Sequence, residues 1–201
     1  MTTQKAHRLL GIAVLLFVAA HIGNHFALFL GVESHLAVQE SLRVIYRHPI
    51  VEPLLLLGVL AQIVLGLKLL YKRGWPKRFW LRMQSLSGLV MAAFLTQHIS
   101  AVLWTRLSWE DVDTNIYWAA SVVSRAPHAL YFMPYYALGM SALFLHFAAF
   151  IAVRKRMPRL AWSILCGSVV LSVAFVATLS GAFFPIELPE PYVAYIEATG
   201  F

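Results

Sequence analysis

Five apolar runs restrict this chain of 201 residues to an all-α architecture that spans a membrane. Apolar residues make up 60% of the sequence and charged residues only 12%, a balance that excludes an ordinary water-soluble domain. Each run has about the length that a helix needs to cross the hydrocarbon core of a bilayer. We expect one transmembrane domain over residues 1–201, with helices at about 9–30, 50–71, 84–104, 129–153 and 160–184.

Charged residues alternate between the two ends of these runs. Most basic residues lie at one set of ends, and all nine acidic residues lie at the other, where only four arginines accompany them. This is the positive-inside asymmetry of membrane proteins and argues against a nucleic-acid groove. It predicts five helices with the N-terminus inside and the C-terminus outside. The first run lacks a small-residue cleavage site, so we interpret it as a retained helix.

The polar segments between the runs also carry some structural signal. Residues 33–49 form a stretch long enough for a short interfacial helix, and residues 108–128 are mildly amphipathic. We expect the second segment to lie on the outer surface of the membrane.

A histidine inside the first run recurs in the third. Residues 7–25 read HRLLGIAVLLFVAAHIGNH, residues 84–99 read QSLSGLVMAAFLTQHI, and the two align without a gap. An ionisable side chain inside hydrocarbon is costly and commonly marks a functional site. The aligned pairs are Gly11 with Gly88, Phe17 with Phe94, His21 with His98, and Ile22 with Ile99. The first two hairpins of the chain are therefore expected to be similar, with a fifth helix added.

His21 and His98 come at similar depths on helices that run in the same direction, as two axial ligands of an upright haem require. Neutral imidazole is the usual ligand of haem iron in electron-transfer cytochromes, and helix bundles hold such cofactors in their cores. The alternative is a non-redox transporter or scaffold in which both histidines are hydrogen-bonded in the core. We favour haem, because the histidines recur with their glycine and phenylalanine neighbours.

A weaker correspondence joins the two returning helices. Aligning LHFAAFIAVRKR with AQIVLGLKLLYKR places His146 opposite Gln62. An amide is a poor ligand for iron, so we expect one haem and leave a second open. His146 then either holds that second haem from one side, contacts a quinone, or is a core histidine bonded to Gln62.

Further polar residues cluster at the acidic ends of the helices. His25 is one turn outward from His21 on the same face, where it could hydrogen-bond a haem propionate or a quinone carbonyl. Propionates are anionic and quinone reduction consumes protons, so arginine and histidine suit this rim. Ordinary interfacial side chains are the alternative for each of them. The candidates are His25, Arg47, His48, Glu52, Arg125 and His128.

Other chemistry has no support in the sequence. There is no zinc-type spacing, phosphate loop, nucleophile elbow or dinucleotide fingerprint. The single cysteine, Cys166, lies in an apolar run. Any redox chemistry must therefore come from a bound cofactor.

The segments LLGIAVLLFVAAHIGNHFA, QSLSGLVMAAFLTQHI and LHFAAF resemble the cytochrome b membrane-anchor subunit of succinate dehydrogenase and fumarate reductase, respiratory complex II. The chain is most similar to the single-chain, five-helix type that binds two haems, and the resemblance covers nearly its whole length. It implies that His21 and His98 hold the outer haem. The inner haem would take His146 and residue 62, but Gln62 replaces the histidine expected there.

The same resemblance implies a haem b- and menaquinone-binding electron-transfer subunit in the bacterial cytoplasmic membrane. Glu52 resembles the carboxylate that the family places near its menaquinone. Flavoprotein and iron–sulfur subunits would dock on the basic loops at 72–82 and 154–159 and carry out the dicarboxylate chemistry. The alternative is a stand-alone, quinone-linked b cytochrome without these partners.

Overall fold

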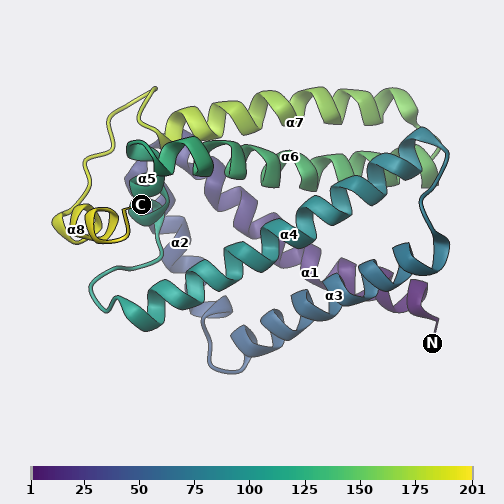
Figure 1. Cartoon of the computed structure of the whole chain (residues 1–201), viewed down its shortest axis with the longest axis horizontal. Helices are drawn as coiled ribbons and strands as arrows, with labels where there is room; N and C mark the ends of the chain where they lie inside the picture. Colours follow the sequence, from purple (N-terminus) through teal and green to yellow (C-terminus); the bar gives the residue numbers. More distant parts are fainter. Residues whose placement is uncertain (1, 201) are drawn as a thin grey trace. The chain divides into compact units, whose positions relative to one another are not determined.

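The computed structural model describes residues 2–200, and within this range it is helical and contains no strand. Five helices are long and apolar enough to cross a membrane (Figure 1). The chain is therefore a multi-pass membrane protein, as the apolar runs predict. The five helices are α1 (Thr3–Ala27, continued by the 3₁₀ turn η1 at Leu28–Leu30), α3 (Val51–Arg73), α4 (Phe79–Ser108), α6 (His128–Arg154) and α7 (Pro158–Leu179).

Three shorter helices lie between or after the long ones. They are α2 (Val32–Tyr46), α5 (Ile116–Ser124) and α8 (Glu190–Ala198). The first confirms the short helix predicted from residues 33–49. The third was not predicted: Pro189 precedes it with an extended backbone, and Pro191 occupies its first turn, where the missing N–H costs little.

The predicted ends of several helices need correction. α1 begins at Thr3 rather than residue 9, because the Thr2 hydroxyl accepts a hydrogen bond from the Lys5 N–H and caps the helix. α4 is longer than the predicted 84–104 at both ends. α7 ends at Leu179, so the prediction that the fifth helix reaches residue 184 is wrong. The chain turns at Gly181, whose φ of 84° favours glycine.

Two compact units make up the chain, one ending at Ser85 and the other beginning at Leu86. In the first unit, α1 packs against α3, and α2 packs against both. α1 and α3 are in contact at Gly58, where an added Cβ atom would lie at ordinary van der Waals distance from Leu10 Cδ1 (3.7 Å) and Val14 Cγ2 (3.8 Å). Residues early in α1 contact residues late in α3, so the two helices are antiparallel.

The second unit is built around the α6–α7 pair, whose helices run side by side (Figure 1). Their interface is rich in small residues, and Ser141 Oγ donates to Ser172 Oγ at 3.0 Å. Small residues and hydroxyl bonds are typical of helix contacts inside a membrane, where lipid offers apolar side chains no disadvantage. α5 packs on α6, α7 and α8, and most of its residues are buried.

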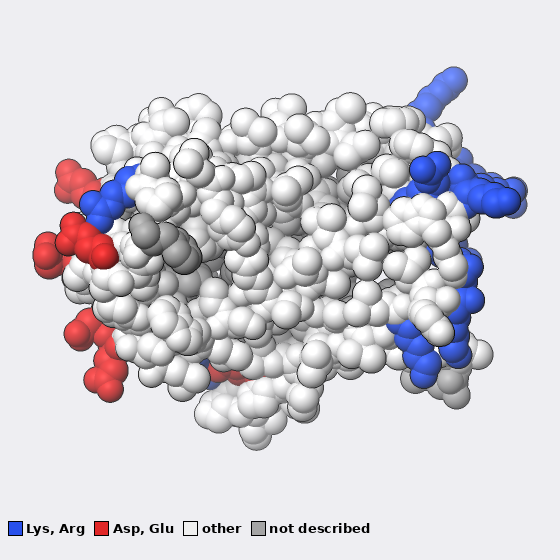
Figure 2. Space-filling view, viewed as in Figure 1, with Lys and Arg blue, Asp and Glu red and all other residues white. Residues whose placement is uncertain are grey.

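Each unit separates its charges along its long helices. In the second unit, Arg154 to Arg159 gather at the turn between α6 and α7, and Glu187, Glu190 and Glu197 follow the opposite end of α7. In the first unit, Lys72 and Arg73 end α3 and Glu52 opens it. Figure 2 shows extensive uncharged surface outside these charged groups, as contact with lipid requires.

Candidate functional site

α1 carries two histidines on successive turns of one face. His21 Nε2 and His25 Nε2 are 3.1 Å apart, with the two rings nearly perpendicular. Phe17, one turn before His21, stacks on its imidazole with ring centroids 5.5 Å apart and 18° between the planes. The spacing of four residues along an α-helix brings these three rings together.

The second unit repeats the phenylalanine–histidine pair. Phe94 stacks on His98 with centroids 5.4 Å apart and 10° between the planes. Tyr135 of α6 stacks on the other side of the pair, 4.6 Å from Phe94, and the ring of Phe94 lies against Gly139, where no side chain would fit. The residues aligned by sequence thus have the same local geometry in each unit. His21 belongs to the first unit and His98 to the second, and their pairing around one haem stays a prediction.

The returning helix of each unit also contacts the aligned glycine. A Cβ atom on Gly11 would lie 2.8 Å from Gln62 Nε2, and one on Gly88 would lie 3.5 Å from His146 Cε1. The contact is tight at Gly11, where glycine leaves room for the Gln62 amide, and of ordinary van der Waals distance at Gly88. Gln62 and His146 therefore occupy equivalent positions in their own units, in agreement with the weaker alignment.

Each of these two residues has a polar partner that the sequence did not reveal. Gln62 Nε2 lies 3.4 Å from His7 Nε2, and the His7 ring packs against Gly66. His146 Nδ1 lies 3.2 Å from the hydroxyl of buried Ser87. Gln62 Oε1 and His7 Nδ1 are buried without a hydrogen-bond partner. The His7 contact could have been predicted from the antiparallel register of α1 and α3, because this register places His7 opposite Gly66 whenever Gly11 is opposite Gln62.

α2 presents a polar face, formed by His35, Gln39 and Arg43 on successive turns, to the first unit. Asn24 of α1 lies 3.2 Å from His35 Nε2 through its Nδ2, and the His35 and His25 rings are 5.8 Å apart. Burial lowers the pKa of His35 to about 4, and the charges of His21 and Arg43 add to this effect. His35 is therefore a neutral imidazole at neutral pH. The residue spacing in α2 was the missed signal, because polar residues four apart share one helix face.

An apolar groove of about 470 Å³ opens beside the turn of α1 that carries Phe17. Tyr46 at the end of α2 meets Phe17 edge to face across it, with centroids 5.5 Å apart. Helices α1, α2 and α3 all contribute to its lining. The lining residues include Ala13 and Ala20 of α1, Leu42 of α2, and Leu54, Leu55 and Gly58 of α3. The predicted rim residues Arg47, His48 and Glu52 follow Tyr46 in the α2–α3 turn and the first turn of α3.

Arg125 and His128 attach the C-terminal segment to the second unit. Arg125 Nη2 forms an exposed ion pair with Glu197 of α8 at 3.3 Å. Buried His128 is 3.2 Å from the carbonyl oxygen of Thr199, to which its Nε2–H donates. Both predicted rim residues thus have a structural role in the described part of the chain.

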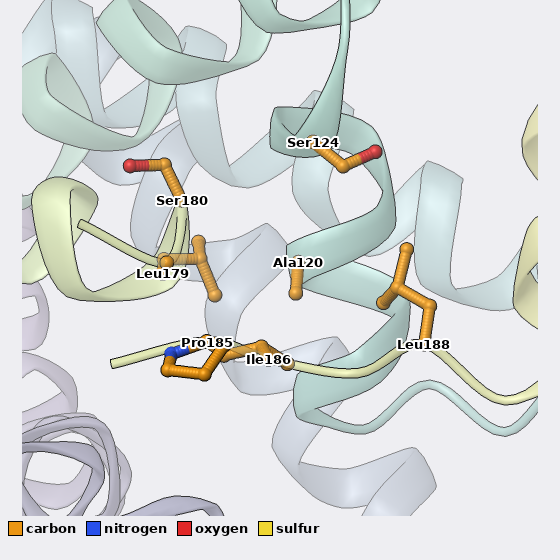
Figure 3. Close-up of a pocket in the computed structure, with 8 residues that line it drawn as sticks. Ala120, Ser124, Leu179, Ser180, Pro185, Ile186 and Leu188 are labelled. Atoms are coloured by element: carbon orange, nitrogen blue, oxygen red, sulfur yellow. The ribbon is translucent and has the colours of Figure 1, made fainter. Parts of the chain in front are cut away.

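A second cavity, of about 260 Å³, lies in the second unit between α5, the end of α7 and the following segment (Figure 3). Figure 3 shows Pro185, Ile186 and Leu188 along one side of it and Ala120 and Leu179 facing it. Its serine hydroxyls already donate to nearby carbonyls, Ser124 to Ser121 and Ser180 to Ala177. This lining offers a ligand no convergent polar groups.

Among residues 2–200, no three His, Cys, Asp or Glu side chains gather in a way that could hold a metal ion. No family model, curated protein or solved structure matches the chain.

Proposed function

We propose that the chain is a haem b-binding, quinone-linked electron-transfer subunit, with His21 and His98 as the axial ligands of the haem iron. The observation that carries the proposal is the repeated phenylalanine–histidine stack, which has nearly the same geometry on α1 and on α4. Each stack lies on a helix long enough to cross a membrane. Ligation of a haem iron from both sides requires two imidazoles, and the repeat provides two, each stacked on a phenylalanine.

The residues around His21 leave buried polar atoms for a bound group to contact. Asn24 Oδ1, His35 Nδ1 and Gln39 Oε1 are buried polar atoms without a partner in the protein. Such atoms are costly unless something hydrogen-bonds them. The haem would supply one-electron chemistry when bound; the chain supplies the imidazoles, a dry helical environment and polar groups near the ligand helix.

The apolar groove supports the quinone part of the proposal. Its size and lining suit a flat ring with an isoprenoid tail, and menaquinone is the species we assign to it. Arg47 and His48 lie in the α2–α3 turn and Glu52 in the first turn of α3, next in sequence to the groove-lining Tyr46 and Val51. Quinone reduction takes up protons, and a carboxylate and an imidazole next to the ring are groups that can deliver them.

We place the chain in a bacterial cytoplasmic membrane with its N-terminus inside, as two similar hairpins and a fifth helix. The basic loops at 72–82 and 154–159 would then face the cytoplasm and receive flavoprotein and iron–sulfur subunits like those of complex II. His146 remains a candidate ligand for a second haem.

One observation favours a stand-alone quinone-linked cytochrome as a second candidate. Gln62, which would face the inner haem, is an amide hydrogen-bonded to His7. Without a nitrogen ligand from position 62, the electron path from docked subunits to the outer haem is interrupted. Purification from native membranes separates the two candidates: co-purifying flavin and iron–sulfur centres select the complex II type, and their absence selects the stand-alone type.

Absorption spectroscopy of the purified full chain tests the haem assignment. We expect the reduced-minus-oxidised bands of a six-coordinate b cytochrome in the wild type, and their loss in His21→Ala and in His98→Ala. Thr96→Ala is the matched control, because Thr96 is exposed on α4 and its hydroxyl donates only to its own helix, at Ala92 O. A colourless wild type after haem-replete expression would refute the proposal and favour the non-redox alternative.

A further inference from the structure

The apolar groove of the first unit is elongated, and its two ends differ in chemistry. Its lining on α1 runs from Leu10 to Ala20, which is about 15 Å of helix. At one end Gly58 of α3 lies against Leu10, and every lining side chain there is apolar. At the other end the last turn of α2 contributes Tyr46, and the first turn of α3 contributes Val51. The groove therefore suits a long apolar molecule that carries a polar group at one end.

Tyr46 is the only residue with a polar side chain in the lining, all of which lies within residues 10–58 of the described chain. Its ring contacts Phe17 edge to face, with centroids 5.5 Å apart and 78° between the planes. This contact involves the aromatic ring and not the phenolic O–H, which can donate a hydrogen bond to a ligand. One donor among apolar walls suits a ligand that presents a carbonyl oxygen at the edge of an apolar ring.

Phe17 joins this end of the groove to the candidate haem ligand. The same phenylalanine lines the groove and stacks on the imidazole of His21, with centroids 5.5 Å apart. A flat ring beside Phe17 would therefore be separated from His21 by one side chain. These features favour a quinone over a lipid acyl chain, because a saturated chain presents neither a planar face to Phe17 nor a ring carbonyl to Tyr46.

We propose that Tyr46 binds the quinone ring: its hydroxyl donates a hydrogen bond to one ring carbonyl, and the ring lies beside Phe17. The isoprenoid tail then extends along α1 toward Leu10 and Gly58, where the groove is apolar. The inference rests on the quinone part of the proposed function and deepens it by naming the residue that orients the ring. It also gives the two quinone carbonyls different environments, since they lie on opposite sides of the ring and only one of them can reach Tyr46.

Infrared spectroscopy measures this difference directly. Full-length protein in phosphatidylcholine liposomes is loaded with menaquinone labelled with ¹³C at one or the other carbonyl carbon. We expect one carbonyl stretch at lower frequency than in protein-free liposomes, because a hydrogen bond weakens the C=O bond. Tyr46→Phe keeps the ring and its contact with Phe17 but removes the hydroxyl. In this variant both carbonyls should absorb as they do without protein, and the quinone dissociation constant should rise about three- to tenfold.

Two results of this experiment would overturn the proposal. One is a wild type in which neither carbonyl is shifted, as expected if a phospholipid acyl chain fills the groove instead of the quinone. The other is a carbonyl shift that persists in Tyr46→Phe, which would assign the hydrogen bond to another donor.

Two tryptophan substitutions test whether the ring occupies the groove. Ala20 lines the groove, whereas its neighbour Ala19 is exposed on α1 and is not part of the lining. Ala20→Trp should weaken menaquinone binding by about tenfold or more, because the indole fills space that the ligand needs. Ala19→Trp is the matched control and should leave the affinity unchanged. Equal affinity of the two variants would refute the groove as the binding site.

The haem spectrum separates failure of this inference from failure of the proposed function. A wild type with haem bands, whose quinone is insensitive to both Tyr46→Phe and Ala20→Trp, refutes the inference and leaves the haem function standing. A colourless wild type that still shows the Tyr46-dependent carbonyl shift refutes the haem assignment and supports the inference.

Discussion

Gln62 Nε2 lies 3.4 Å from His7 Nε2, so the position where the repeat would place a histidine holds an amide already bonded to an imidazole of another helix. In the second unit the equivalent residue, His146, keeps its imidazole and bonds Ser87 instead. The two units share a framework of glycine contacts and differ in the chemistry that the framework holds. On the proposed haem function, this difference is expected to determine whether a second haem binds.

Replacing Gln62 tests that point directly. Gln62→His restores an imidazole against Gly11, and we expect the haem content to rise from one to two per chain, measured as haem against protein concentration. Gln62→Leu, which offers no nitrogen, should leave the content at one. Two haems in the wild type would show that position 62 does not limit the haem number.

Glycine contacts make the two units unequal in their tolerance of a methyl group. Gly11→Ala forces a carbon to within 2.8 Å of Gln62 Nε2, whereas Gly88→Ala brings one only to 3.5 Å from His146. Gln62 Nε2 ends a flexible side chain that can move aside at the cost of its contact with His7, so we expect Gly11→Ala to destabilise the protein by no more than about 1 kcal/mol. Gly88→Ala should not destabilise it, because the added methyl group meets His146 at an ordinary contact distance. Gly23→Ala meets nothing within 4 Å and should be neutral or stabilising, by up to about 1 kcal/mol.

Thermal unfolding in detergent measures this order. A lower melting temperature for Gly88→Ala than for Gly11→Ala would contradict the contacts described at Gly11 and Gly88. Gly139→Ala should be the most damaging of the set, because its methyl group would overlap the ring of Phe94.

Acid should destabilise the haem-free protein through His35. Its pKa is about 4 in the folded chain and near 6.5 when unfolded, so between these values the unfolded state binds a proton that the native state refuses. The free energy of unfolding therefore falls as the pH drops from about 6.5 to 4, by about 2–3 kcal/mol at most.

The pH profile of His35→Gln measures that contribution. The variant should lose much of the slope between pH 6.5 and 4, as followed by melting temperature. The loss should be partial, because the other charged and titratable groups nearby, His21, His25 and Arg43, remain. An unchanged slope would assign the acid sensitivity to another group.

The C-terminal segment should depend more on His128 than on Arg125. The Arg125–Glu197 pair is exposed on both sides, so Arg125→Ala should cost less than about 1 kcal/mol. His128 is buried and donates to the Thr199 carbonyl, so His128→Ala should cost about 1–3 kcal/mol. Limited proteolysis after residue 185 reports the difference; equal cleavage of both variants would contradict it.

The membrane helices could be predicted because lipid imposes a simple rule: a spanning segment must satisfy its backbone internally and stay apolar for about twenty residues. The same rule says nothing about where an apolar helix stops inside the protein. α7 ends before Ala182 and Phe183, which are apolar, because the backbone turns at Gly181. α8 was missed for the opposite reason, since a short helix is stabilised by burial of Tyr192, Tyr195 and Ile196 rather than by its length.

The candidate site was predicted in part. The alignment identified His21, His98, Gln62 and His146, and the structure gives the aligned residues matching local contacts within each unit. The partners of these residues were missed, because a contact such as that of His7 with Gln62 follows only once the register of α1 against α3 is known. The buried face of α2 was missed because a polar stretch between apolar runs is indistinguishable, by composition, from a solvated loop.

The ring of Phe94 is tucked into the notch left by Gly139, while Leu55 stands at the corresponding place in the first unit and lines the open groove with Phe17. The second hairpin thus fills this position with its own aromatic side chain, whereas the first hairpin keeps an apolar groove there. A hydrophobic ligand in the bilayer therefore has an apolar site to enter beside α1 and α3.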